Sequence, residues 1–218
     1  MIPLGDVSRR PVRFPVVTLS LILANGAVFF LELSRGQAFV LQWSAVPADI
    51  SAGRHLITIL TAMFLHGSWL HILGNMLFLW VFGPEIEDAM NPGRYLAFYL
   101  VGGVVSMLAQ VAVSPQSTVP TLGASGAIAA VMGAFLITYP RDRIRTVLLL
   151  GFFVTVTFLP AFLLIGLWFL IQLFSGVGSV ASGTSAQTGG VAYMAHVGGV
   201  AFGVLTVRLF EDPSRLGE

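Results

Sequence analysis

The chain consists mainly of long apolar runs separated by polar connections. Six such runs stand out, at residues 16–34, 68–83, 94–113, 124–139, 146–174 and 192–210. An α-helix of about 20 mainly apolar residues spans the hydrocarbon core of a bilayer. The pattern therefore predicts an all-α membrane protein, built as a bundle of six transmembrane helices.

The arginines predict how these helices are oriented, because cytoplasmic connections carry an excess of basic residues. All 11 basic residues are arginine. With the N-terminus in the cytoplasm, nine of them lie on the cytoplasmic side, and only Arg35 and Arg54 lie on the other. We therefore expect cytoplasmic N- and C-termini, with residues 1–15 as an N-terminal segment, 16–210 as the membrane domain and 211–218 as a tail.

The connections differ in character. Residues 35–65 are too apolar for a solvated loop, so we expect them to lie partly in the outer membrane interface. The acidic residues 85–88, followed by Asn-Pro-Gly at 91–93, predict a cytoplasmic turn. The uncharged Gly/Ser/Thr-rich stretch 175–190 predicts a flexible loop on the outer side.

The run at 146–174 is longer than one perpendicular span requires, and Pro160 lies near its middle. Two interpretations remain open. Either residues 146–157 lie along or dip into the cytoplasmic face and 160–174 cross the membrane, or one long kinked helix does both.

Composition agrees with a membrane protein: 56% of residues are hydrophobic, 10% are charged and the mean hydropathy is +0.88. The absence of cysteine excludes disulfides, thiolate nucleophiles and thiolate metal ligands. The net charge is +1 and no long basic run occurs, so nucleic acid is not expected as a partner.

Ser125 is the first candidate for chemistry. Pro120 and Gly123 disfavour the continuation of a helix from upstream, so a helix is expected to begin near Ala124 with Ser125 in its first turn. Backbone N–H groups there lack intrahelical partners, and free donors beside a hydroxyl suit a nucleophile and its oxyanion site. Glycines around a serine also suit a helix-packing notch, which is the commoner use of this pattern.

Three more polar residues lie near the outer starts of predicted spans. His71 and Asn75 are four residues apart and share one helix face, and His196 begins the last span. The second, fourth and sixth spans all run inward, so these side chains and Ser125 can meet at one depth. They suit a nucleophile, a base and oxyanion donors, although polar residues of this kind also hold membrane helices together by hydrogen bonds.

Small residues lie below the serine and the last histidine. Gly199 and Gly203 follow His196 on one face of its helix, and Gly133 lies two turns beyond Ser125. Two such faces can pack closely, which would bring the hydroxyl within reach of the imidazole. A metal site would need carboxylates or further histidines at this level, so no metal is expected.

Together these motifs resemble the rhomboid family of intramembrane serine proteases, in its bacterial six-transmembrane form. The match rests on His71-x-x-x-Asn75, on Gly-Ala-Ser-Gly around Ser125, on Ala-His-x-x-Gly-x-x-x-Gly around His196 and on the acidic turn around Glu87. The resemblance implies a rhomboid-like bundle in the bacterial inner (plasma) membrane, with an active site open to the non-cytoplasmic side.

The resemblance also implies roles. Ser125 would be the nucleophile and His196 the general base of a dyad with no acidic third member. His71, Asn75 and the Ser125 backbone N–H would bind the oxyanion, and Glu87 would brace the first long connection from within. Substrates would be single-span or multi-span membrane proteins cut in or beside their transmembrane segments within the lipid bilayer, without a cofactor, and the fifth span with its following loop would act as a gate.

The chain departs from the family pattern at Ala129, where many members carry an aromatic residue that stacks on the catalytic histidine, and at Ile57-Thr58, where a Trp-Arg pair is often found. A rival hypothesis is a non-catalytic rhomboid-like protein that binds transmembrane clients. The presence of both Ser125 and His196 favours the protease.

Overall fold

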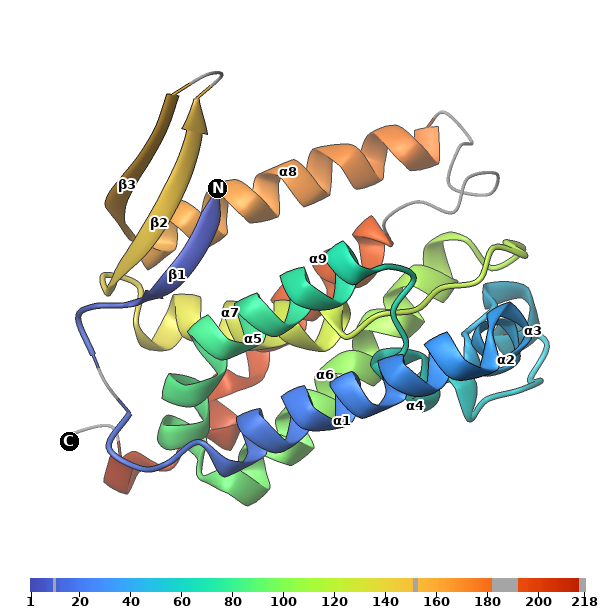
Figure 1. Cartoon of the computed structure of the whole chain (residues 1–218), viewed down its shortest axis with the longest axis horizontal. Helices are drawn as coiled ribbons and strands as arrows, with labels where there is room; N and C mark the ends of the chain where they lie inside the picture. Colours follow the sequence, from blue (N-terminus) through green and yellow to red (C-terminus); the bar gives the residue numbers. More distant parts are fainter. Residues whose placement is uncertain (10, 151–152, 182–191, 216–218) are drawn as a thin grey trace.

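The computed structural model describes residues 1–9, 11–150, 153–181 and 192–215. Six long helices form a bundle (Figure 1): α1 (Val16–Arg35), α5 (Trp69–Met90), α6 (Pro92–Val113), α7 (Ser125–Thr138), α8 (Ala161–Ala181) and α9 (Tyr193–Phe210). Short helices follow α1: α2 (Gln37–Trp43), α3 (Pro47–Ser51), α4 (Thr58–Thr61) and η1 (Ala62–Phe64). A further short helix, η3 (Pro213–Arg215), follows α9. Three strands form one antiparallel sheet: β1 (Ile2–Asp6), β2 (Arg143–Leu150) and β3 (Phe153–Pro160).

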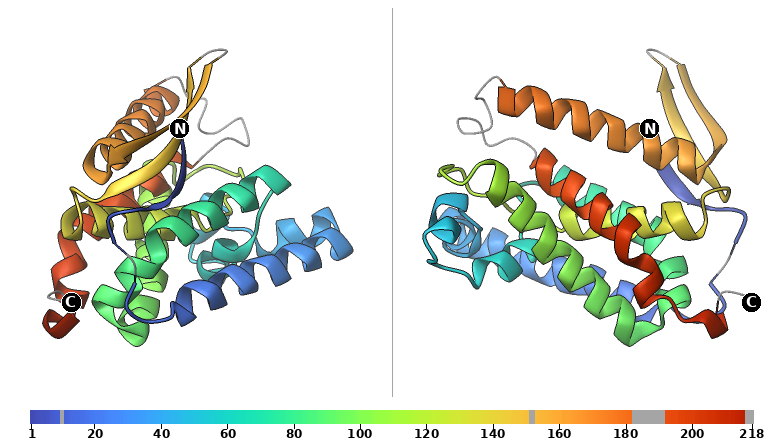
Figure 2. Two further views of the ribbon diagram at one scale, coloured as in Figure 1. Left: turned by 60° about the vertical axis from the view of Figure 1, so that its left-hand side comes forward. Right: turned by 180° about the vertical axis from the view of Figure 1, so that it is seen from behind.

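Helix α7 lies at the centre of the bundle. Residues 126–135 are buried on every side of this helix, which contacts α5, α6, α8 and α9. Figure 2 shows α6 and α9 side by side in the view from behind. At 14 residues α7 is about 21 Å long, shorter than the hydrocarbon core of a bilayer. Helices α5, α6, α8 and α9 therefore surround a short central helix.

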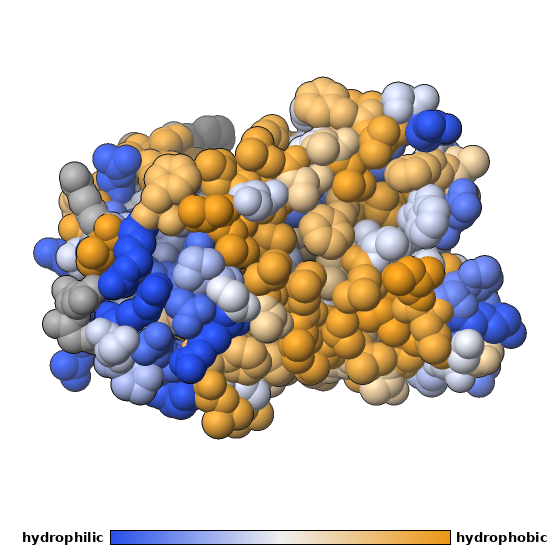
Figure 3. All heavy atoms as spheres, turned by 90° about the horizontal axis from the view of Figure 1, so that it is seen from below, coloured by the Kyte–Doolittle hydropathy of each residue, from blue (hydrophilic) through white to orange (hydrophobic). Residues whose placement is uncertain are grey.

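The outer helices have the length and composition of membrane spans. Among the described residues, α1, α6, α8 and α9 each qualify alone, and α4–η1 with α5 would form a fifth span broken by a bend of 91°. Figure 3 shows a broad apolar band across the molecule, with hydrophilic residues gathered at its ends. The chain is a mostly helical, multi-pass integral membrane protein.

Each predicted apolar run overlaps one of the long helices, but the predicted start of the cytoplasmic turn after the second run was wrong. α5 continues through Pro84 to Met90, so residues 85–88 are helical and not part of a turn. The chain turns instead at Asn91, which has a φ of 71° and whose side chain accepts a hydrogen bond from the Arg94 N–H at the start of α6.

The prediction of an all-α protein was also wrong. Residues 143–150 and 153–160 pair as β2 and β3 of a hairpin, and β1 pairs with β2. Along β2 exposed Arg143 and Arg145 alternate with buried Ile144 and Thr146, the period of a strand with one covered face. The hairpin is also rich in β-branched and aromatic residues, which favour strands.

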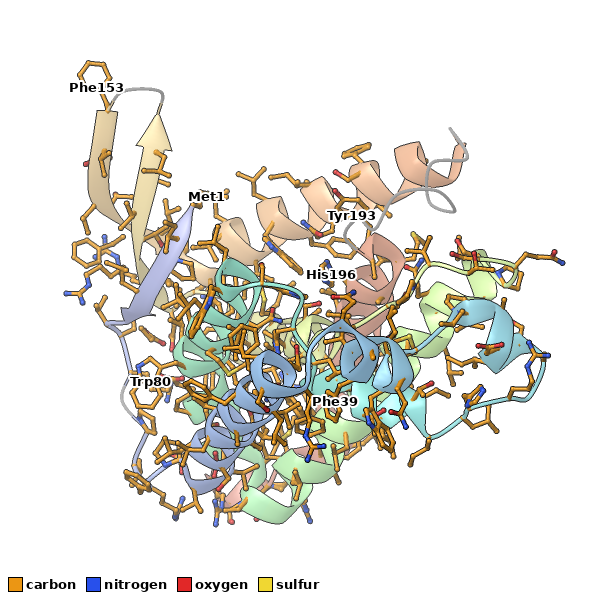
Figure 4. The ribbon with its side chains drawn as sticks, turned by 45° about the vertical axis from the view of Figure 1, so that its right-hand side comes forward. Met1, Phe39, Trp80, Phe153, Tyr193 and His196 are labelled. Atoms are coloured by element: carbon orange, nitrogen blue, oxygen red, sulfur yellow. The ribbon has the colours of Figure 1, made fainter. Side chains whose placement is uncertain are left out.

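The hairpin settles the path of the 146–174 run. Pro160 ends β3 and α8 begins at the next residue, so the single kinked helix is excluded, while the helical character expected after residue 160 is confirmed. Phe153, at the far end of the hairpin, lies well away from the bundle (Figure 4). Residues 175–181 belong to α8 rather than to the predicted loop, and the rest of that loop, 182–190, lies outside the described residues.

The long connection after α1 packs against the segment that precedes α7. Ala45 and Thr121 exchange two backbone hydrogen bonds of 2.9 and 2.7 Å. The Gly123 N–H donates to the Ala62 carbonyl oxygen at 2.8 Å. The loop leading into Ser125 is thus fixed from the side by residues far earlier in the chain.

Gly203→Ala tests the packing of α9 on α7. A Cβ at this position would collide with the Ala130 carbonyl oxygen and lie 2.9 Å from the Ala134 nitrogen. Overpacking of about 1–3 kcal/mol should lower the thermal midpoint in detergent by about 5 °C. The matched control is Gly166→Ala on α8, where a Cβ has no neighbour within 4 Å and the midpoint should hold or rise.

Asp6 should make the stability of the sheet depend on pH. Burial, together with the nearby Asp142 carboxylate, raises the pKa of Asp6 from 3.8 to about 6. The folded state therefore binds this proton more tightly than the unfolded state does. The resulting stabilisation of the folded state is complete below pH 4 and is lost as the pH rises through 6. Relative to wild type, Asp6→Asn should raise the thermal midpoint above pH 7 and have little effect near pH 4. A difference that stays constant over this range would contradict the assignment.

Candidate active site

The Ser125 hydroxyl oxygen lies 2.8 Å from Nε2 of His196. Ser125 is the first residue of α7, after an Ala124 cap and after Gly123, whose φ of +125° turns the chain into the helix. His196 belongs to the first turn of α9 and is buried. Figure 4 shows it at the start of α9, on the side covered by α8. Two helix starts thus bring a hydroxyl and an imidazole into hydrogen-bond contact.

Glycines hold α7 and α9 at the distance that this contact requires. A Cβ on Gly199 would collide with the Gly126 carbonyl oxygen, and one on Gly133 would lie 2.5 Å from the Val200 carbonyl oxygen. The two backbones therefore touch directly below the serine and the histidine. Ser106 of α6 adds a third contact, since its hydroxyl donates to the Gly126 carbonyl oxygen at 2.9 Å.

His71 lies on the other side of Ser125, in the first turn of α5. The Ser68 hydroxyl caps this helix by accepting the His71 N–H at 3.2 Å. The Gly67 N–H approaches Nδ1 of the His71 ring at 3.4 Å, so Nδ1 is the acceptor and Nε2 carries the proton of the neutral ring. A Cβ on Gly123 would lie 2.8 Å from that Nε2 and 3.6 Å from the Ser125 hydroxyl oxygen. A ring N–H donor therefore lies beside the serine.

Asn75 follows one turn later on the same face of α5. Its side-chain nitrogen is buried and has no hydrogen-bond partner among the described residues. A cavity of about 970 Å³ is lined by this side chain and by the other polar groups of the site: His71, Ser125, Gln172, Tyr193 and His196. The cavity therefore holds a hydroxyl, its imidazole neighbour and two side-chain donors, beside the N-terminus of α7 with its free N–H groups.

Helix α8 contributes two residues that the sequence analysis missed. Nδ1 of His196 lies 2.7 Å from Oε1 of Gln172. The Trp168 ring lies 5.4 Å from the His196 ring, centroid to centroid, at an interplanar angle of 37°. The aromatic neighbour that Ala129 does not supply from α7 thus comes from α8. A lone glutamine within an apolar run was the signal that could have identified Gln172.

Glu32 was missed as well, although it lies inside the first apolar run. Its carboxylate is buried and accepts the backbone N–H of His66 at 3.0 and 3.2 Å. The His66 ring lies 5.1 Å from the His71 ring, centroid to centroid. Glu32 therefore fixes the backbone just before the helix that carries His71.

Glu87 contacts the start of α1 and not the long connection that the family resemblance implied for it. Its two carboxylate oxygens accept the backbone N–H groups of Val17 and Thr18, both at 2.8 Å. These are the first residues of α1, at the end opposite to the long connection that Glu87 was expected to brace. A carboxylate at a helix N-terminus satisfies free N–H groups and interacts favourably with the helix dipole, so Glu87 anchors the start of α1.

Comparison with known proteins decides the family. The rhomboid domain matches residues 53–212. The chain belongs to the rhomboid family. This matched range contains Ser125, His196, His71 and Asn75, and it also contains the missed Gln172.

Several rhomboid proteins are similar to the chain. RHOMBOID-like protein 12, mitochondrial, of Arabidopsis thaliana is 33% identical over 201 residues, which cover 85% of this chain and 55% of that protein. Rhomboid protein 1, mitochondrial, of Saccharomyces cerevisiae is 30% identical over 195 residues, covering 85% and 51%. Rhomboid protease GlpG of Pectobacterium atrosepticum is 31% identical over 189 residues, covering 87% and 60%. The chain thus spans about half the length of these relatives.

Gly123→Ala tests the arrangement around Ser125. An added Cβ would meet the His71 ring at 2.8 Å, in a backbone conformation that alanine rarely adopts. The variant should react with a fluorophosphonate at Ser125 about 10²-fold more slowly, because the His71 ring N–H beside the serine is displaced. Gly166→Ala on α8 is the control, since its Cβ would have no neighbour within 4 Å and the residue does not line the cavity. Equal labelling rates in both variants would contradict this geometry.

Proposed function

We propose that this rhomboid protein is an intramembrane serine endopeptidase of the bacterial six-transmembrane type. The observation that carries the proposal is the 2.8 Å contact between the Ser125 hydroxyl and Nε2 of His196. It lies at the start of two apolar helices, in a cavity lined by further hydrogen-bond donors. A nucleophile, a base in contact with it and donors for the developing charge are the parts that acyl transfer requires.

In the proposed reaction, the Ser125 hydroxyl oxygen attacks a peptide carbonyl carbon while its proton passes to Nε2 of His196. The negative charge on the carbonyl oxygen is stabilised by His71 Nε2–H, the Asn75 amide and the Ser125 backbone N–H. His196 then donates its proton to the leaving amine, and an ester to Ser125 remains. Water, deprotonated by the same imidazole, hydrolyses this ester and restores the serine.

Substrates are proposed to be membrane proteins, cut in or beside a transmembrane segment. The cavity lies between the outer parts of α5 and α8, with Asn75 and Phe78 on one side and Trp168 and Ile171 on the other. Both helices also present large apolar side chains to the outside, such as Leu73 and Phe174. A substrate helix in the bilayer would therefore approach between α5 and α8, and α8 would act as the gate.

The proposed topology has six spans with both termini in the cytoplasm of a bacterium and the cavity open to the other side of its inner membrane. Two features support it: each of the six predicted apolar runs overlaps a long helix, and nine of the 11 arginines fall on the side assigned to the cytoplasm. α7 would cross as the short, fully enclosed member of the bundle.

Cleavage of a model transmembrane substrate in detergent or liposomes tests the proposal. Ser125→Ala and His196→Ala should each lower kcat by about 10⁴-fold or more, and His71→Ala or Asn75→Ala by about 10²–10³-fold. Ser34→Ala, an exposed serine at the end of α1, is the control and should cleave normally.

Cleavage that persists in Ser125→Ala would refute the assigned nucleophile. Substrate that binds equally well to wild type and Ser125→Ala without ever being cut would instead support the non-catalytic client-binding protein.

A further inference from the structure

Gln172 is placed unusually for a residue of α8. This helix is otherwise strongly apolar here: the sequence from 167 to 174 is Leu-Trp-Phe-Leu-Ile-Gln-Leu-Phe. Its neighbours Ile171 and Phe174 are 50% and 72% exposed, whereas Gln172 is 9% exposed and faces the bundle. A buried amide costs free energy unless it is hydrogen-bonded. The contact that compensates for this cost is the one to His196.

The contact determines which nitrogen of the imidazole carries the proton. The Oε1 atom of Gln172, 2.7 Å from Nδ1 of His196, can only accept a hydrogen bond. Nδ1 must then be the donor, and Nε2 of the neutral ring keeps its lone pair. That lone pair faces the Ser125 hydroxyl oxygen at 2.8 Å. Only this tautomer of His196 can take the proton of the serine.

The orientation of the ring also depends on α8. Ala129, buried on α7, has only a methyl group and offers neither a hydrogen bond nor a ring to stack on. Trp168 and Gln172 are four residues apart and lie on one face of α8. Trp168 contacts the face of the His196 ring, and Gln172 contacts its Nδ1 atom. α8 thus supplies both restraints on the ring besides the serine.

We propose that Gln172 is a positioning residue that completes a Ser125–His196–Gln172 relay, with a neutral amide as third member. It holds the imidazole in the Nδ1–H tautomer and keeps the ring in line with the serine. Since the amide is neutral, it does this without burying a carboxylate in the membrane region. The inference rests on the proposed function, and it has a further consequence: the relay is complete only while α8 is seated on α9.

Two variants separate positioning from packing. Gln172→Met keeps the length of the side chain but removes the acceptor, so kcat should fall about 10- to 100-fold while KM and the thermal midpoint change little. Gln172→Glu keeps an acceptor and should recover most of the activity. Its negative charge would favour the imidazolium, so the acidic limb of the pH–rate profile should move to higher pH. Gln110→Met on α6, also 9% exposed and not part of the cavity lining, is the matched control and should behave as wild type.

A second measurement does not depend on cleavage. The ¹⁵N spectrum of labelled histidine, assigned with His196→Ala, should show His196 protonated at Nδ1 in the wild type and should lose this preference in Gln172→Met. An unchanged tautomer together with unchanged kcat in Gln172→Met would overturn the proposal. The proposal would also be overturned if both Gln172 variants lost activity and lost thermal stability to the same extent. If the wild type cleaves nothing, the proposed protease function fails, and the spectrum alone decides whether Gln172 sets the tautomer.

Discussion

Direct contact between the backbones of α7 and α9 is the constraint on which the site depends. Helices in a bilayer gain little from burying apolar side chains against one another, so close packing of small residues holds them together. Most helix pairs lie 8–10 Å apart between their axes. The glycines at 133, 199 and 203 remove the side chains that would hold α7 and α9 at such a distance. The short hydroxyl of Ser125 reaches His196 because nothing larger separates the helices below them.

Two buried carboxylates have a comparable role at the ends of α1. Glu32, near one end, accepts the N–H of His66, which precedes α5. Glu87, on α5, accepts two N–H groups at the other end of α1. α1 is therefore joined near both of its ends to α5 and to the residue that precedes it by hydrogen bonds to carboxyl oxygens. The helix that carries His71 and Asn75 is thus held near both of its ends, although neither carboxylate lines the cavity.

The sequence predicted the parts of this structure that depend on periodicity and on the capping of helices. The start of α7 at Ser125 followed from Pro120 and Gly123, and the shared face of His71 and Asn75 followed from their spacing. The pairing of β2 with β3 was missed because a long apolar run satisfies the length criterion for a span whether it forms a helix or two strands. Gln172 was missed for a different reason: its partner is 24 residues away, and only the packing of α8 on α9 reveals the pair.

The sheet sets how α8 can move. The first residues of α8 are tied down, since the N–H groups of Ala161 and Phe162 donate to the carbonyl oxygens of Asp142 and Pro140 at 2.8 and 2.9 Å. The hairpin that leads into them pairs with β1, which in turn packs on α5. A helix that is held at its N-terminal end moves most at its C-terminal end when it tilts. Any tilt of α8 would therefore pivot at the sheet and move Trp168 less than Gln172 and the residues that follow it. Opening the bundle on this side and separating the imidazole from its amide would then be a single movement.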